Sequence, residues 1–157
     1  MKITLLMVGK TTDNYLIKLI ENYQNRLKFY VPFEMVVIPE LKNTKTLSMA
    51  EQCEREADLI LKQLESTDHV ILLHDKGTQF SSVGFSEFLA KKQLGSHKRI
   101  VFVVGGAYGF SPKVLQRADA LLSLSSMTFS HQMVRLIFVE QLYRAMTILK
   151  GEPYHHE

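Results

Sequence analysis

Apolar runs of strand length alternate five times with stretches of helical periodicity along this chain, and this alternation restricts the fold more than any other feature. The first run, Lys2 to Val8, is almost continuously apolar and ends at Gly9, as expected for a strand covered on both faces. The other runs of strand length are 33–38, 70–73, 100–104 and 120–124. Strands that alternate with helices form parallel sheets. The sequence therefore predicts an α/β fold with a mainly parallel sheet and helices on both faces.

Capping residues mark the ends of several of the predicted helices. Thr12 or Asp13 can cap the first helix, and Ser48 with Glu51 forms a capping box for the second. The other termini are marked by Ser81 or Ser82, by Ser111 with Pro112, and by Gly151. No low-complexity linker or internal repeat separates the elements. We therefore expect one domain that spans residues 1–157.

The size and composition of the chain favour a cytoplasmic protein without disulfides. A domain of 157 residues buries roughly 70% of its unfolded surface, so it needs no metal or disulfide to hold it together. The single cysteine, Cys53, cannot form an internal bridge. No apolar run is long enough for a signal peptide or a membrane span, so no membrane partner is expected. The net charge of +3 permits contact with nucleic acid but is too small to indicate it alone.

Three segments of unusual composition follow predicted strands in the second half of the chain. They are Leu73 to Gly77, Gly105 to Phe110 and Leu124 to Ser130. Ligands of parallel sheets bind beyond the carboxyl ends of the strands, so these segments would line one pocket if their strands are neighbours. Glycines allow backbone groups to approach a ligand such as adenine closely. A glycine pair also fits a plain tight turn, and the sequence alone leaves both interpretations open.

The common cofactor motifs are absent. Gly9 to Thr12 follows the first strand without the second glycine of the dinucleotide fingerprint, and no glycine stands five residues before Gly9 to make a P-loop with Lys10. An ordinary nicotinamide or flavin site is therefore not expected. His131, His155 and His156 lack the further close ligand or cysteine pair that a zinc site needs, so the sequence predicts no metal.

A set of motifs spread over the whole chain resembles those of the RlmH-type SPOUT methyltransferases. The motifs are Met1-Lys2-Ile3 with Val8-Gly9-Lys10, Leu73 with Lys76-Gly77, Val103 to Gly109, Ser123 to Phe129 with His131 to Arg135, Glu140 to Ala145, and Pro153-Tyr154-His155. The order and spacing of the whole set are more specific for this family than any single motif is. The resemblance implies a SPOUT fold with a C-terminal trefoil knot, which ordinary topology rules would not predict.

The resemblance also implies an activity and its partners. It implies a homodimer that transfers a methyl group from S-adenosylmethionine to N3 of a pseudouridine in 23S ribosomal RNA, on assembled ribosomes. Motif by motif, the implied cofactor contacts are Leu73, Gly105, Gly106, Leu124, Ser125, Ser126, Met127, Thr128 and Phe129. All of these lie in the three unusual segments. The implied catalytic candidates are His131, Arg144, Tyr154 and His155.

Two positions depart from the family's usual pattern. Ser130 stands where a proline usually precedes the histidine, and His74 stands where an acidic residue often follows the leucine. Serine can cap the final helix as well as proline can open it, so the first departure has little expected effect. The role of His74 is left open.

The chemistry of methyl transfer requires few catalytic side chains. A sulfonium methyl donor is already activated, so the enzyme mainly has to align the nitrogen nucleophile with it. The N3–H must still lose its proton. Our hypothesis is that His155, or a water that it holds, assists this step while Arg144 offsets the charge that develops on the base carbonyls. The alternative for these tail residues is a frayed, exposed C-terminus.

The last predicted helix, from about His131 to Leu149, is apolar almost all round. Such a helix is buried on more than one side, either under its own chain or against a second subunit. We expect a two-fold homodimer that uses this helix, in which the tail of one subunit completes the site of the other. Two other functions stay open on the sequence. They are a different nucleotide-dependent α/β enzyme and a non-catalytic ribosome-binding factor.

Overall fold

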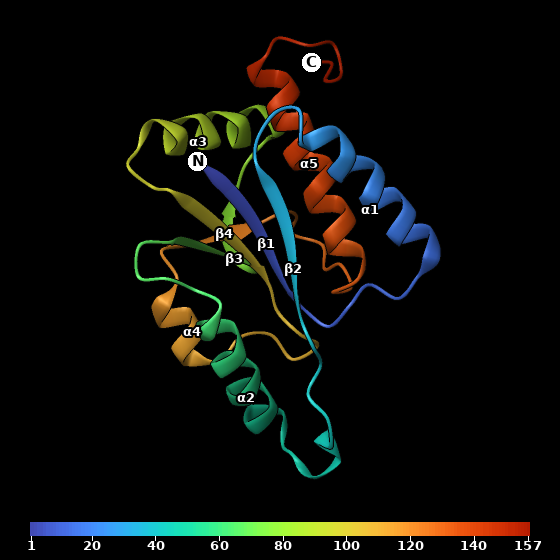
Figure 1. Cartoon of the computed structure of the whole chain (residues 1–157), viewed down its shortest axis with the longest axis vertical. Coiled ribbons are helices and arrows are strands. Elements are labelled where there is room, and N and C mark those ends of the chain that lie inside the picture. Colours follow the sequence, from blue (N-terminus) through green and yellow to red (C-terminus); the bar gives the residue numbers. More distant parts are fainter.

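The computed structural model describes residues 1–157 and contains one five-stranded sheet (Figure 1). Its strands are β1 (Lys2–Val8), β2 (Phe33–Ile38), β3 (His69–Gln79), β4 (Arg99–Val104) and β5 (Ala120–Ser123). Their order is β2-β1-β4-β3-β5, and every neighbouring pair is parallel. The predicted parallel sheet is confirmed. Since β3 lies between β4 and β5, the three unusual segments leave neighbouring strands, as one common pocket requires.

Helices cover both faces of the sheet, as predicted (Figure 1). The helices are α1 (Asn14–Leu27), α2 (Met49–Lys62), α3 (Ser82–Leu94), α4 (Pro112–Arg117) and α5 (Met133–Leu149), with a 3₁₀ turn at Thr44–Thr46. Successive strand residues point to opposite faces, and the core is divided accordingly. Ile3, Leu5 and Met7 pack with α1, α3 and α5, whereas Leu6 and Val8 pack with α2 and α4.

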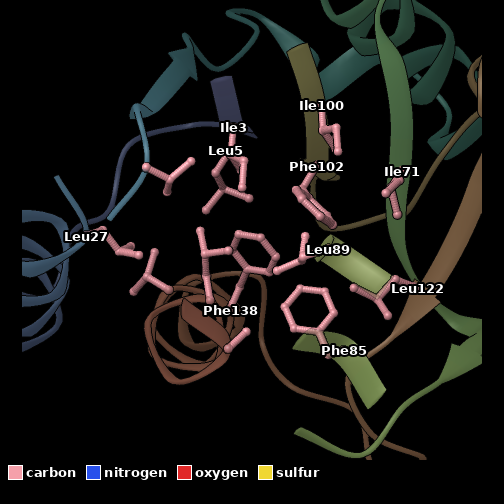
Figure 2. Close-up of a cluster of buried hydrophobic side chains, with 14 of the residues drawn as sticks. Ile3, Leu5, Leu27, Ile71, Phe85, Leu89, Ile100, Phe102, Leu122 and Phe138 are labelled. Carbon is pink, nitrogen blue, oxygen red and sulfur yellow. The ribbon is translucent and has the colours of Figure 1, made fainter. Parts of the chain in front are cut away.

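Helix α5 lies between α1 and α3 and fills the centre of the larger core cluster. Figure 2 shows Phe138 of α5 pointing toward Phe102 of β4, and their ring centroids are 4.7 Å apart. Phe138, Val139 and Leu142 are fully buried. Packing within its own chain therefore explains most of the all-round apolar character of this helix.

Most of the predicted caps are present. Asp13 accepts hydrogen bonds from the backbone of α1, and the Ser48 and Ser81 hydroxyls accept from Glu51 and Gly84 at 3.1 and 3.0 Å. Gly151 has a φ of 69° beyond the end of α5, which is the left-handed conformation expected of a terminating glycine. Ser111 is the N-cap residue of α4 and Pro112 is its first residue, as predicted, although the Ser111 side chain makes no capping hydrogen bond.

Strand β3 is longer than predicted. The polar residues after Leu73 indicated a loop, but the strand continues to Gln79 with a register shift between Leu73 and Thr78. Gly77 lies within this irregular part. A Cβ there would be 2.6 Å from backbone atoms of Leu121 and Leu122, so a glycine is needed for this close approach of β3 to β5. Helix α5 also begins at Met133, two residues later than predicted.

At the amino end of β3, His69 is expected to make stability depend on pH. Its ring is 4.7 Å from that of His97, and its Nε2 atom is buried without a hydrogen-bond partner. Burial, with a smaller effect of Lys92, lowers the pKa of His69 below its ordinary 6.5, although Asp119 opposes the shift. The unfolded chain therefore takes up a proton near its ordinary pKa while the folded protein does not. Stability should be full above that pH and decrease as the pH falls below it.

Urea unfolding at about pH 7.5 and pH 5.5 measures this effect. We expect His69→Gln to lose less stability than the wild type over this interval. His156→Gln, which changes an exposed histidine, is the control and should behave as the wild type does. An unchanged pH dependence in His69→Gln would show that other groups are responsible.

Candidate functional site

A cavity of about 530 Å³ lies beyond the carboxyl ends of β4 and β5 and beside the irregular part of β3. This volume is within the range of small-molecule sites. The lining residues are Leu73 to Asp75, Val104 to Ala107, Gly109 and Phe110, Leu122 to Ser125, Met127 to His131, and Val134. Residues from all three unusual segments thus share one cavity.

The structure places most of the expected cofactor residues on the wall of this cavity. Leu73, Gly105, Gly106, Leu124, Ser125, Met127, Thr128 and Phe129 all line it. Ser126 is the exception, since it is exposed and does not contribute to the wall. His131, one of the catalytic candidates, also faces this cavity.

His74 and Phe110 also line the cavity; they lie in the predicted segments but were not among the implied cofactor contacts. His74 lies roughly parallel to the Phe110 ring, with 6.4 Å between centroids and 20° between planes. The His74 Nδ1 atom accepts a hydrogen bond from the Lys76 N–H at 3.0 Å, which corresponds to a neutral ring. Asp75 Oδ1 is also 3.0 Å from Nδ1, but pairing with it requires a proton on that nitrogen. The sequence left the role of His74 open, and the structure shows that this residue forms part of the cavity wall.

Local hydrogen bonds hold the segment that follows β5. The Ser123 hydroxyl donates to the Ser125 carbonyl at 2.9 Å, and the Ser125 hydroxyl accepts from the Met127 N–H at 3.0 Å. The Ser130 hydroxyl accepts from the Met133 N–H at 3.0 Å, so it caps the entry into α5 as predicted. These hydrogen bonds fix the local conformation of this part of the wall.

A buried arginine ties the same segment to the end of β1. Arg135 is fully buried, and its guanidinium donates to the carbonyls of Val8, Gly9 and His131 at 2.8–3.0 Å and to the Thr11 hydroxyl at 3.1 Å. No carboxylate pairs with it. Burial accordingly lowers the pKa of Arg135 from its ordinary value. The sequence gives no signal for this role, because an arginine one turn into a helix normally faces solvent.

Both glycines of the Gly105–Gly106 pair allow close approach of a neighbouring side chain. A Cβ on Gly105 would be 3.1 Å from the Phe110 ring, and one on Gly106 would be 2.7 Å from the Glu56 carboxylate. The Gly109 N–H donates to the Gly106 carbonyl at 3.2 Å, which closes the turn. The pair therefore makes a tight turn and also a narrow wall between the cavity and helix α2.

Three of the four catalytic candidates gather at the far end of α5. The Arg144 guanidinium donates to Glu140 at 2.6 Å and is 3.1 Å from His155 Nδ1, and it stacks on the Tyr154 ring at 4.7 Å. The Tyr154 hydroxyl donates to Glu140 at 2.9 Å. Glu140 raises the pKa of Arg144, while burial and hydrogen bonding raise that of Tyr154. The tail is thus packed rather than frayed up to His155.

The catalytic candidates fall into two groups within one chain. His131 is at the cavity, whereas Arg144 lies 11 residues beyond the start of α5 at Met133, or about 17 Å along a helix. In Figure 1 the C-terminus lies at the top of the molecule, and β1 and β2 run away from it toward their carboxyl ends. The lining of the cavity includes none of Arg144, Tyr154 and His155. One chain therefore does not bring the tail and the cavity together.

No three His, Cys, Asp or Glu side chains lie close enough together to hold a metal ion. None of the helices combines the length and the apolar character needed to cross a membrane.

Comparisons with known proteins agree with this architecture. Residues 1–155 match the family model described as "Predicted SPOUT methyltransferase". The chain is 57% identical over 157 residues to "Ribosomal RNA large subunit methyltransferase H" of Parabacteroides distasonis. It is 55% identical to the protein of the same name from Bacteroides thetaiotaomicron. Each alignment covers 100% of this chain and 100% of the relative. Among solved structures, a probable methyltransferase from Bordetella pertussis Tohama I is similar with a TM-score of 0.55, at 11% identity over 92% of this chain and 96% of that one. The latter similarity concerns the fold alone.

Proposed function

This chain belongs to the SPOUT methyltransferase family, and we propose that it methylates N3 of a pseudouridine in 23S ribosomal RNA on assembled ribosomes. Relatives more than 50% identical over their full length carry the name of a large-subunit ribosomal RNA methyltransferase. A ribosomal substrate would place the activity in the cytoplasm. The trefoil knot implied by the family resemblance stays a prediction.

The cavity beyond β4 and β5 and beside β3 is the observation that carries the proposal. We propose that it binds S-adenosylmethionine, which supplies an activated methyl group on a sulfonium. Leu73, Leu122 and Leu124 offer apolar surface for a flat ring, and backbone groups of the glycine pair can contact its polar edge. The volume of about 530 Å³ is sufficient for a ligand of nucleoside size.

The tail supplies the groups for the target base. An arginine can only donate, so His155 Nδ1 is the acceptor in its contact with Arg144 Nη1. His155 Nε2 lies 3.2 Å from Glu157 Oε1, without the alignment of a hydrogen bond. We propose that Arg144 turns from His155 to the base carbonyls on substrate binding. This movement would free Nδ1, directly or through a water, to take the proton of N3, the nucleophile for the methyl group. The bound donor would supply that methyl group and leave as a thioether.

The separation of tail and cavity supports a two-fold homodimer. About 17 Å of helix α5 lies between the two groups of candidates in one chain. A second subunit can place its tail at the cavity without any change in either fold. Each of the two sites of the dimer would then contain a cavity from one subunit and Arg144, Tyr154 and His155 from the other.

Methyl incorporation into purified ribosomal particles tests the proposed function. With radiolabelled S-adenosylmethionine, we expect label in the large-subunit RNA of whole ribosomes and none in small subunits. His155→Ala should lower incorporation by about two orders of magnitude. Unlabelled ribosomes would contradict the proposal. Calorimetry with S-adenosylmethionine and with ATP then separates the alternatives. Binding of ATP would indicate another nucleotide-dependent enzyme. Binding of neither S-adenosylmethionine nor ATP would indicate a non-catalytic factor.

Mixing two inactive variants tests the shared site. Gly106→Val should displace the wall of the cavity, since its Cβ would be 2.7 Å from the Glu56 carboxylate, and His155→Ala should remove the tail function. After subunit exchange of equal amounts, half of the dimers combine the two variants and have one intact site each. The mixture should therefore regain about a quarter of wild-type methyl transfer. Activity that stays at the level of the separate variants would exclude a site shared between subunits.

A further inference from the structure

A second, smaller cavity of about 160 Å³ lies on the other side of the glycine pair. Its wall shares Gly106, Ala107 and His131 with the larger cavity. The rest of the wall comes from the end of β1, from the segment after β2 and from α2. Most of it is polar: Glu40, Thr44, Gln52 and Glu56, with Val8 and Leu41. The proposed methyl transfer leaves these polar residues without a role.

Glu56 is the least satisfied group of this cavity. Its side chain lies in the wall of the cavity, and the residue is only 5% exposed. Gln52 is the only residue that donates a hydrogen bond to the carboxylate, at 3.3 Å to Oε2. Oε1 packs against Gly106, at the boundary between the two cavities. Burial raises the pKa of Glu56, and the neighbouring Glu40 adds to the shift. A buried carboxylate with so little compensation favours a cationic partner.

The other polar groups of the cavity complement an anion. Gln52 has a second amide N–H, Thr44 has a hydroxyl, and the His131 ring can donate from nitrogen. Carboxylates and hydrogen-bond donors thus line the same small space. An α-amino acid end, which carries an ammonium and a carboxylate on one carbon, matches this combination.

We propose that the second cavity binds the amino-acid end of the methyl donor, with Glu56 accepting hydrogen bonds from its ammonium group. This inference rests on the proposed function, because it places the adenosine of that donor in the larger cavity. Gly106, Ala107 and His131 line both cavities, so the two cavities adjoin at these residues. Glu40 adds a second negative charge, and Gln52 and Thr44 contact the carboxylate.

Two ligands that differ at the amino-acid end test this inference by calorimetry. S-adenosylhomocysteine carries the complete amino-acid end, and methylthioadenosine carries only a methyl group in its place. Glu56→Gln should weaken binding of S-adenosylhomocysteine at least about tenfold, since a charge-assisted hydrogen bond is lost. Binding of methylthioadenosine should stay within about twofold of the wild type. Glu40→Gln should weaken only S-adenosylhomocysteine, and by a smaller factor.

Glu54→Gln is the matched control, because Glu54 lies on the same helix and pairs with Lys113 outside the cavity. It should leave both affinities unchanged. An equal loss for both ligands in Glu56→Gln would show that Glu56 only supports the glycine pair, and no loss for either would show that the cavity holds only solvent. Both outcomes overturn the inference. A wild-type protein that binds neither ligand would instead contradict the proposed function.

Discussion

Arg144→Ala is expected to lower the rate constant of methyl transfer by about two to three orders of magnitude, with little change in the affinity for S-adenosylmethionine. The guanidinium has no contact with the donor cavity of its own chain, so donor binding does not depend on it. Its loss removes the proposed charge stabilisation on the target base. It also removes the partners of Glu140 and His155, which hold the tail in place. Single-turnover kinetics and calorimetry measure the two quantities separately.

Two further variants separate chemistry from folding in this experiment. Arg144→Lys keeps the charge but loses the planar donor arrangement, so it should recover only part of the rate. Arg55→Ala changes an exposed arginine of α2 and should have the wild-type rate. If Arg144→Ala lowers donor affinity and rate by the same factor, the residue supports the site and does not act on the target base.

Arg135→Met is expected to lower the free energy of unfolding by about 3 to 5 kcal/mol. The substitution keeps much of the volume but leaves the carbonyls of Val8, Gly9 and His131 without their hydrogen-bond donor in a buried space. For a domain of this size, such a loss corresponds to a fall of roughly 10 °C in Tm. Denaturant unfolding monitored by circular dichroism gives the free energy directly.

The Arg135→Met substitution should also weaken the ligand site. Arg135 joins the end of β1 to the turn that carries His131, so the wall beside α5 would lose its anchor. Donor affinity should therefore fall together with stability. Arg55→Met, at an exposed position, should change the free energy of unfolding by less than about 0.5 kcal/mol. A fully stable Arg135→Met variant would mean that the surrounding backbone finds other donors.

The fold was largely predictable because its signals are local. Lys2 to Val8 has no polar residue between Ile3 and Val8 except Thr4, and a run of this kind forms a buried parallel strand whatever surrounds it. The extension of β3 was missed for the opposite reason. His74, Asp75 and Lys76 have the composition of a loop, and only the neighbouring β5 makes them part of a strand.

The candidate site was predictable where its residues follow strands. The glycine pair and the segment after β5 take their positions from the sheet, so knowledge of the strand ends already places them. Arg135 and Glu56 were not predictable as buried groups. Their role depends on partners more than 40 residues away in sequence, Gly9 for Arg135 and Gly106 for Glu56, and no short motif records such contacts.

The position of the tail at the end of α5 opposite the cavity has a consequence for dilute solutions. A lone subunit would still bind the methyl donor, because the whole cavity belongs to one chain. It would lack a neighbour's Arg144 and His155 and would not transfer the methyl group. As the protein is diluted below the dissociation constant of the proposed dimer, donor binding should decrease in proportion to protein concentration, whereas the initial rate of methylation should decrease with its square.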